Sequence, residues 1–372
     1  MRVTFVIPSD GMTGGARVVA IYADRLIRRG HEVVIISGAR KQGSFQEKLK
    51  SLVLGRGWPK DPEPQPSYFT QFGIPVRTLE KPRPVVDSDV PESDVVIATW
   101  WETAEWVSDL SVNKGAKIYF IQHHEVFPYL PVERCHATYR LPLQKIVISH
   151  WLEKIMKEQY NDDKALLIPN SVATLQFFAP KRQKHADPAV GFVYSTTEFK
   201  GSDIVLAALE LIKQRIPKLR VIAFGADRPS TKLPLPSWIE FHFRPPQDQI
   251  RLLYSKCDVW LCGSRSEGFY LPMLEAMACR CPVVSTRVGG PIDTVMDAVN
   301  GFLVEIEDAS GLAASTLKVL QLSDADWQLM SDAALLTATH YSWDDAADRL
   351  ENTLLRLANQ HLENSPAGVL RN

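Results

Sequence analysis

The sequence predicts an α/β fold of two β/α/β domains that follow one another along the chain. Apolar, strand-like runs alternate with amphipathic helical segments, and this alternation restarts after a polar linker at residues 181–187. The 372 residues exceed one ordinary core and fit two domains. A composition of 45% apolar and 23% charged residues is typical of a soluble globular protein.

The first half begins with a buried-type strand at 2–8. A loop at 9–15 carries Gly14 and Gly15, and an amphipathic helix then ends at Gly30. Such units build parallel sheets that bind ligands at the carboxyl ends of the strands. Further expected elements are strands at 33–36, 94–99, 116–121 and 145–149 and a helix at 150–159.

The second half repeats this pattern. Its expected strands are 190–194, 219–224, 238–243, 257–262, 282–285 and 301–304. Helices are expected at 202–215 and, at the end, 344–360, followed by a loose tail.

Charge and cysteine content exclude several classes of protein. The net charge of −1 gives no basic field for nucleic acid. Five cysteines, without a Cys-x-x-Cys pair, favour a reducing compartment over a disulfide framework. The sequence contains no run of 18 apolar residues, so no membrane-spanning helix is expected.

Residues 40–60 depart from the α/β rhythm. They contain six basic residues and one acidic residue, with apolar side chains in between. This segment is interpreted either as a solvated helix-and-loop excursion or as an interfacial segment that engages anionic lipid or a lipid-linked acceptor.

The most informative stretch is 264–279. A strand runs into a loop with Gly268, and a helix follows with Pro272 in its first turn. Backbone N–H groups at such a helix start attract anions, while Glu267 and Glu275 could accept hydrogen bonds from sugar hydroxyls. The pattern therefore favours a sugar nucleotide. The alternative is a capping box of Ser264 and Glu267 with a solvated Glu275.

This stretch resembles the Glu-x7-Glu signature of family 4 retaining glycosyltransferases (glycosyl transferases group 1), which adopt the GT-B fold. The resemblance implies two Rossmann-like β/α/β domains facing each other across a cleft. The expected ranges are 1–170 for the acceptor domain, 171–345 for the nucleotide-sugar domain and 346–372 for a final helix that crosses back to the first domain. It also implies that Glu267 is catalytic and that donor binding involves Gly268, Phe269, Tyr270, Leu271 and Glu275.

Other segments are similar to the same family. Gly14 and Gly15, followed by Arg29-Gly30-His31-Glu32-Val33, look like its glycine loop near the donor. Lys200 matches the lysine that contacts the donor pyrophosphate and is assigned a catalytic and donor-binding role.

One position departs from the family pattern. The family's arginine, about five residues before the lysine, is replaced by Tyr194 and Ser195, and Ser195 is kept as a donor-binding candidate. This departure leaves open weaker turnover, an inactive relative or a compensating base, for which Arg17, Arg244 and Arg265 are candidates.

The strand at 116–121 delivers Gln122-His123-His124-Glu125 to the edge of its sheet. His123 and His124 are candidate catalytic groups, and the resemblance does not decide between them. Trp100 and Glu125 are candidate acceptor-binding residues, although core packing also explains Trp100. The Gln-x-x-Glu spacing is weakly similar to bacterial rhamnosyltransferases. No third ligand for a zinc site is evident.

The predicted function is a retaining, metal-independent glycosyltransferase of the hexosyltransferase type, without a cofactor. It would move a sugar from a nucleotide-diphosphate sugar to a hydroxyl of a glycan or lipid-linked acceptor, in cell-surface polysaccharide or glycoconjugate synthesis. The expected location is cytoplasmic, with peripheral membrane contact through 40–60 if that segment is interfacial. The alternatives are a non-catalytic nucleotide-sugar or glycan-binding relative and a GT-B nucleotide-sugar epimerase.

Overall fold

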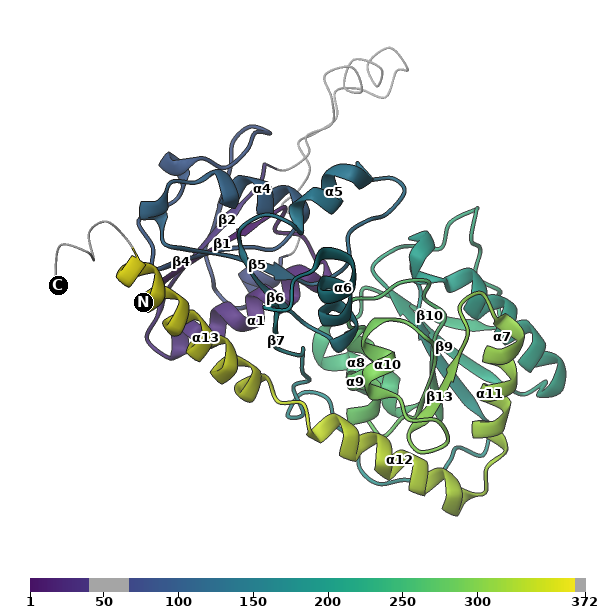
Figure 1. Cartoon of the computed structure of the whole chain (residues 1–372). Coiled ribbons are helices and arrows are strands. Elements are labelled where there is room, and N and C mark those ends of the chain that lie inside the picture. Colours follow the sequence, from purple (N-terminus) through teal and green to yellow (C-terminus); the bar gives the residue numbers. More distant parts are fainter. Residues whose placement is uncertain (40–66, 365–372) are drawn as a thin grey trace, which may run out of the picture. The chain divides into compact units, whose positions relative to one another are not determined.

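The computed structural model describes residues 1–39 and 67–364. The chain divides into two compact units (Figure 1). The first contains Met1–Ile146, Tyr160–Leu166 and the chain from Ala347 on, and the second contains Val147–Gln159 and Leu167–Ala346. Residues 147–159 and 167–170, which lie within the expected range 1–170, group with the second unit.

The first unit is built on a seven-stranded sheet with the order β3-β2-β1-β4-β5-β6-β7. The pairings of β1 with β2 and β4, of β2 with β3 and of β4 with β5 are parallel. The strands are β1 (Arg2–Ile7), β2 (Glu32–Ser37), β3 (Val76–Thr78), β4 (Val95–Ala98), β5 (Ala116–Ile121), β6 (Gln144–Val147) and β7 (Leu166–Leu167).

Helices of the first half connect these strands. They are α1 (Gly14–Arg28), α3 (Tyr68–Gln71), α4 (Trp101–Asp109), α5 (Val132–Thr138) and α6 (His150–Tyr160), with 3-10 turns η1 (Asp87–Asp89) and η2 (Val112–Lys114). Helix α1 begins at Gly14 rather than after Gly15, because the Thr13 side chain caps it by accepting from the Ala16 amide at 3.1 Å.

The second unit has a six-stranded parallel sheet with the order β10-β9-β8-β11-β12-β13. Its strands are β8 (Ala189–Val193), β9 (Arg220–Gly225), β10 (Ile239–Phe243), β11 (Val259–Cys262), β12 (Val283–Thr286) and β13 (Gly301–Val304). The order reverses beside β8, and β8 and β11 therefore end at the switch point where open α/β sheets bind ligands.

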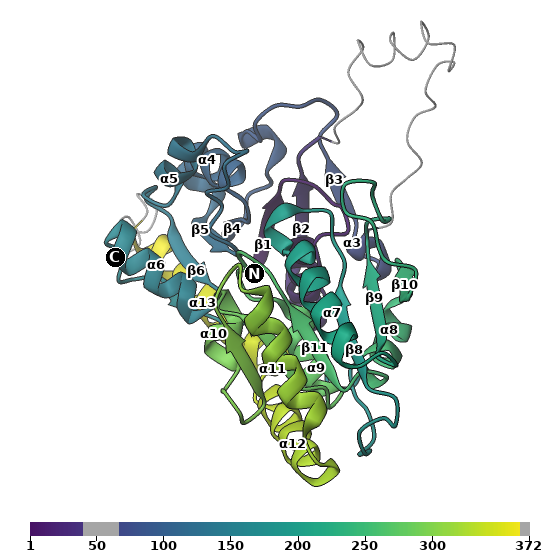
Figure 2. The same ribbon diagram turned by 90° about the vertical axis from the view of Figure 1, so that its right-hand side faces the viewer.

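Helices cover both faces of this sheet (Figures 1 and 2). Helices α7 and α11 pack together on one face, and α9 packs against β11 and β12 with α8 and α12 as neighbours. The remaining bounds are η3 (Glu198–Lys200), α7 (Ser202–Arg215), α8 (Gln247–Ser255), α9 (Leu271–Ala278), α10 (Gly289–Thr294), α11 (Ala309–Gln321), α12 (Asp324–Thr339) and α13 (Trp343–Asn364).

Helix α13 is anchored to the first unit by its later turns. Arg29 pairs with Asp348 at 2.5 Å and Glu351 at 2.9 Å, and His31 Nε2 lies 2.6 Å from Glu351 Oε1. The Arg-Gly-His segment noted in the sequence therefore holds the last helix in place.

Candidate functional site

A lysine–glutamate pair stands at the centre of the candidate site in the second unit. Lys200 is the last residue of η3, and its Nζ donates to both carboxylate oxygens of Glu267 at 2.9 Å. Ser264 Oγ donates to the same carboxylate at 2.8 Å. The Glu267 side chain is 5% exposed and that of Lys200 36% exposed, so the pair lies at the boundary between protein and solvent.

Glycine allows the lysine loop to reach this position. Gly201 has φ +58°, and a Cβ there would lie 1.8 Å from the Gly263 carbonyl oxygen, directly after β11. The Arg265 amide also donates to the Phe199 carbonyl at 2.8 Å. The turn carrying Lys200 is thus packed onto the end of β11, where no larger residue fits.

The segment after Glu267 is packed equally closely against α10. A Cβ on Gly289 would lie 1.8 Å from the Glu267 carbonyl oxygen, and one on Gly290 would lie 2.1 Å from that of Phe269. The Gly-Gly turn therefore fixes the backbone of 267–269, including Gly268.

Tyr270 is the residue before α9 and has a left-handed backbone with φ +67°. Its phenol faces the core, where it accepts from Trp260 Nε1 and lies 3.3 Å from the Leu261 carbonyl. Burial raises the pKa of this phenol well above its ordinary value. The side chain of Tyr270 therefore belongs to the core. Any contact of Tyr270 with a donor would come from its backbone, next to that of Leu271 at the start of α9.

Glu275 lies within α9 and is buried, with 4% exposure. Its carboxylate accepts from the Tyr254 hydroxyl at 2.8 Å. The alternative interpretation of this stretch is wrong on both points, since Glu275 is not solvated and α9 begins at Leu271, too far from Ser264 for a capping box.

Ser195 belongs to a loop held by Asp227, which follows β9. One Asp227 oxygen accepts from the Ser195 hydroxyl at 3.0 Å, the Thr196 amide at 3.0 Å and the Thr196 hydroxyl at 3.1 Å. A carboxylate thus lies where the family resemblance leads one to expect an arginine. Sequence reasoning missed Asp227, because its contact with Ser195 spans two strands and leaves no local spacing signal.

The three candidate replacement bases are placed differently. Arg265 pairs with Asp203 and Glu307, which raise the pKa of the guanidinium, and Arg17 lies on α1 of the first unit. Arg244 donates through Nε to the Ala226 carbonyl at 3.0 Å and stacks on Phe243.

In the first unit, His123 and His124 point to different partners. His123 Nδ1 lies 3.1 Å from the His124 carbonyl, whereas His124 Nε2 lies 2.7 Å from the Tyr160 hydroxyl. That hydroxyl is also 2.7 Å from His136 Nδ1. Burial, with His136 and His123 nearby, lowers the pKa of His124 to about 4, so its ring is neutral at pH 7.

Glu125 and Trp100 occupy the same end of the sheet. Glu125 is buried, accepts from the Trp101 amide at 2.8 Å and lies 3.2 Å from the Tyr119 hydroxyl. Burial raises the pKa of this carboxyl well above its ordinary value. The buried Glu125 carboxylate therefore holds the loop in place through these hydrogen bonds. Trp100 is half-buried and is the residue before α4.

The glycine loop and the histidine segment are neighbours. Gln122 Nε2 donates to the Gly15 carbonyl at 3.3 Å, so Gly15 and the residue before His123 are in contact. Gly14 forms the first residue of α1 beside them.

Other features of the described residues bear on the remaining predictions. No three His, Cys, Asp or Glu side chains at 1–39 and 67–364 are grouped as a metal site requires. Within the same ranges, no helix is long and apolar enough to cross a bilayer. The basic segment 40–60 lies outside the described residues.

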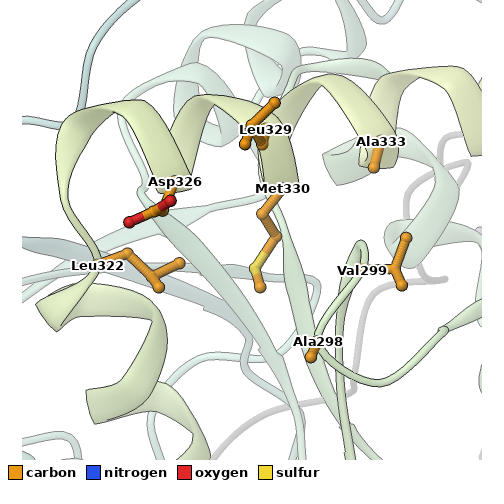
Figure 3. Close-up of a pocket in the computed structure, with 7 residues that line it drawn as sticks. All are labelled: Ala298, Val299, Leu322, Asp326, Leu329, Met330 and Ala333. Atoms are coloured by element: carbon orange, nitrogen blue, oxygen red, sulfur yellow. The ribbon is translucent and has the colours of Figure 1, made fainter.

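A separate pocket of about 430 Å³ lies beneath α12 (Figure 3). Val299, Leu329 and Met330 line it, with Asp326 as the charged residue at its edge. None of the residues that line this pocket is basic, so the pocket does not suit a diphosphate.

One family of known proteins matches the part of the chain that contains the Lys200–Glu267 pair. Residues 175–334 match the family described as glycosyl transferases group 1. This range contains Lys200, Glu267, Glu275 and the loop held by Asp227.

Curated relatives match over part of the chain. The D-inositol 3-phosphate glycosyltransferase of Salinispora arenicola is 32% identical over 171 residues, covering 42% of this chain and 38% of that protein. The enzyme of the same name from Corynebacterium urealyticum is 27% identical over 223 residues, covering 52% of each. The chain thus spans about half, or less, of the length of these two relatives.

Solved structures match over nearly the whole chain. Sucrose-phosphate synthase from Thermosynechococcus elongatus gives a TM-score of 0.73 at 16% identity, covering 96% of this chain and 99% of that one. Anabaena HepE, solved in complex with UDP-glucose, gives 0.71 at 18% identity, covering 96% and 100%. At such identities the likeness concerns the fold, and the predicted GT-B fold class is confirmed.

Proposed function

We propose that this chain is a retaining, metal-independent glycosyltransferase of the group 1 glycosyl transferases, the family that residues 175–334 match. It transfers a sugar from a nucleotide-diphosphate sugar to a hydroxyl of a glycan or lipid-linked acceptor. We place this activity in the cytoplasm, in the synthesis of cell-surface polysaccharide or glycoconjugate, with residues 40–60 as the segment that would contact a membrane.

The observation that carries the proposal is the Lys200–Glu267 pair held beside the start of α9, with Glu275 buried in the same helix. An ammonium group and the first-turn N–H groups of a helix suit a diphosphate. Two carboxylates suit sugar and ribose hydroxyls. The UDP-glucose bound in the HepE structure supports a nucleotide sugar as the donor class.

We propose the following reaction, whose retaining course is implied by the family resemblance. The bond between the sugar's anomeric carbon and the diphosphate breaks, and Lys200 with the backbone N–H groups around Gly268, Phe269 and Leu271 stabilises the departing charge. Pro272, the residue after Leu271, has no N–H to contribute. The acceptor hydroxyl attacks on the same face and forms the new glycosidic bond, and its proton passes to a diphosphate oxygen. Glu267 positions the sugar, and Glu275 binds a ribose hydroxyl.

The first unit supplies the acceptor side of this proposal. His124, with its pKa near 4, is a neutral imidazole that can exchange hydrogen bonds without carrying charge. His123 and Trp100 lie at the same end of β4 and β5, and Gly14 and Gly15 begin the neighbouring α1. We propose that they orient the acceptor hydroxyl and the donor sugar.

A titration of UDP, GDP, dTDP and ADP against the full chain, with and without magnesium, tests the proposal. We expect one nucleotide to bind selectively and independently of magnesium. Glu275→Gln should weaken it by about tenfold, as expected for a lost charge-assisted hydrogen bond. Glu210→Gln, on the exposed side of α7, is the matched control and should have no effect. Failure of all four nucleotides to bind would refute the proposal.

A second function is favoured by one observation. The carboxylate of Asp227, rather than an arginine, contacts the loop at Ser195, so the site has one cation fewer than the family resemblance implies. A nucleotide-sugar-binding protein without transferase activity would show selective nucleotide binding but no turnover of the corresponding donor.

A further inference from the structure

The carboxyl ends of all strands in the second unit's parallel sheet meet at one edge. Here β8 leads into Ser195, β11 leads into the Glu267 segment, and β9 and β10 end at Gly225 and Phe243. The residues just after β9 and β10 therefore belong to the same ligand-binding edge as the proposed donor site.

Two arginines lie against one aromatic ring at this edge. The guanidinium of Arg228 is 4.2 Å from the centroid of Phe243, and that of Arg244 is 5.0 Å from it. Both residues are exposed. In the part of the chain that the structure describes, no ion pair joins either to a carboxylate. Two like charges are thus held close together by the ring without a counter-ion.

Two other cations at this edge already have carboxylate partners. Lys200 pairs with Glu267, and Arg265 pairs with Asp203 and Glu307. Arg228 and Arg244 therefore add positive charge that those carboxylates do not offset.

The backbone of Arg244 supports a role for its side chain. Its φ is +47°, in the left-handed region where glycine is favoured and a long side chain is strained. A strained residue at a sheet edge is an observation from which a functional role can be inferred.

We propose that Arg228 and Arg244 form a second cationic element that binds the diphosphate of the donor and replaces the arginine missing at Ser195. Strand β10 lies two strands from β8, roughly 10 Å at the usual strand spacing. An extended arginine side chain together with a diphosphate spans that distance. This inference rests on the proposed function, because it assigns further residues to the same donor.

Calorimetric titration of the full chain with the preferred nucleoside diphosphate and with its nucleoside tests this assignment. Arg244→Gly and Arg228→Gln should each weaken diphosphate binding by about tenfold and leave nucleoside binding unchanged. Arg244→Gly also relieves the backbone, so folding is retained. The salt dependence of diphosphate binding should become shallower in both variants.

Arg251→Gln is the matched control. Arg251 likewise stacks on a phenylalanine, Phe178, at 4.5 Å, but it lies near Cys279 at the opposite end of α9 from the donor loop. Its removal changes the net charge equally and should leave diphosphate binding unchanged.

The outcomes separate this inference from the proposed function. Unchanged diphosphate binding in both variants, or an equal loss for diphosphate and nucleoside, overturns the assignment while wild-type binding keeps the proposed function standing. An equal loss in Arg251→Gln would show a general charge effect and overturn it as well. If the wild type binds no nucleotide, both proposals fall.

Discussion

The Lys200–Glu267 pair gives a quantitative prediction. Removing one partner of a fully buried pair costs about 3–5 kcal/mol, part of which comes from the charge left unpaired, so the coupling itself is smaller; exposed pairs contribute at most about 1 kcal/mol. Glu267 is 5% exposed and Lys200 36% exposed, so water screens the pair from the lysine side. We therefore expect a coupling free energy of about 1.5 kcal/mol, between these limits.

A double-mutant cycle measures this coupling. The free energy of unfolding is determined for the wild type, Lys200→Met, Glu267→Gln and the double variant. In parallel, Glu267→Gln should lower turnover by about 100-fold while nucleotide affinity changes by less than about threefold, because the role proposed for Glu267 is to position the sugar. A coupling below about 0.5 kcal/mol, or a loss confined to nucleotide affinity, would refute the reasoning.

Three further predictions concern stability. Glu351→Gln should destabilise the chain at pH 7. The hydrogen bond from His31 lowers the pKa of Glu351, so this stabilisation is present above the ordinary value of 4.5 and is lost as pH falls through the lowered pKa. The urea midpoints of wild type and variant should therefore converge over that range, and a constant gap between them would contradict the assignment. Tyr254→Phe should cost about 1–2 kcal/mol of unfolding free energy and weaken nucleotide binding through Glu275, and unaltered affinity in titration would exclude that link. Gly201→Ala should destabilise by about 2 kcal/mol or more, whereas Gly30→Ala, with φ +85° but open space around its Cβ, should cost about 1 kcal/mol; equal thermal shifts would argue against close packing beneath Lys200.

Much of the fold could be predicted because its strands are buried apolar runs. Observed strands such as β8 and β11 lie within one or two residues of their expected positions, since a buried strand in a parallel sheet has a local sequence signal. Short elements such as β3 and α5 have weaker patterns and were not predicted. Helix α1 begins earlier than expected because the Thr13 cap overrides the glycines that follow it.

The candidate site was predictable only where its residues are close in sequence. Glu267 and Glu275 could be found from their spacing on one loop and helix. Asp227 could not, because its contact with Ser195 depends on two neighbouring strands ending together. The buried hydroxyl of Tyr254 on Glu275 likewise depends on how α8 packs against α9.

Turnover of the donor tests the central claim most directly. The full chain is incubated with the sugar donor of its preferred nucleotide, and NMR follows release of the nucleoside diphosphate and the anomeric configuration of the transferred sugar. The account predicts nucleoside diphosphate release without added metal, with the sugar keeping the donor's anomeric configuration and with the rate lowered about 100-fold by Glu267→Gln. Tight nucleotide binding without release, or a product of inverted configuration, would contradict it.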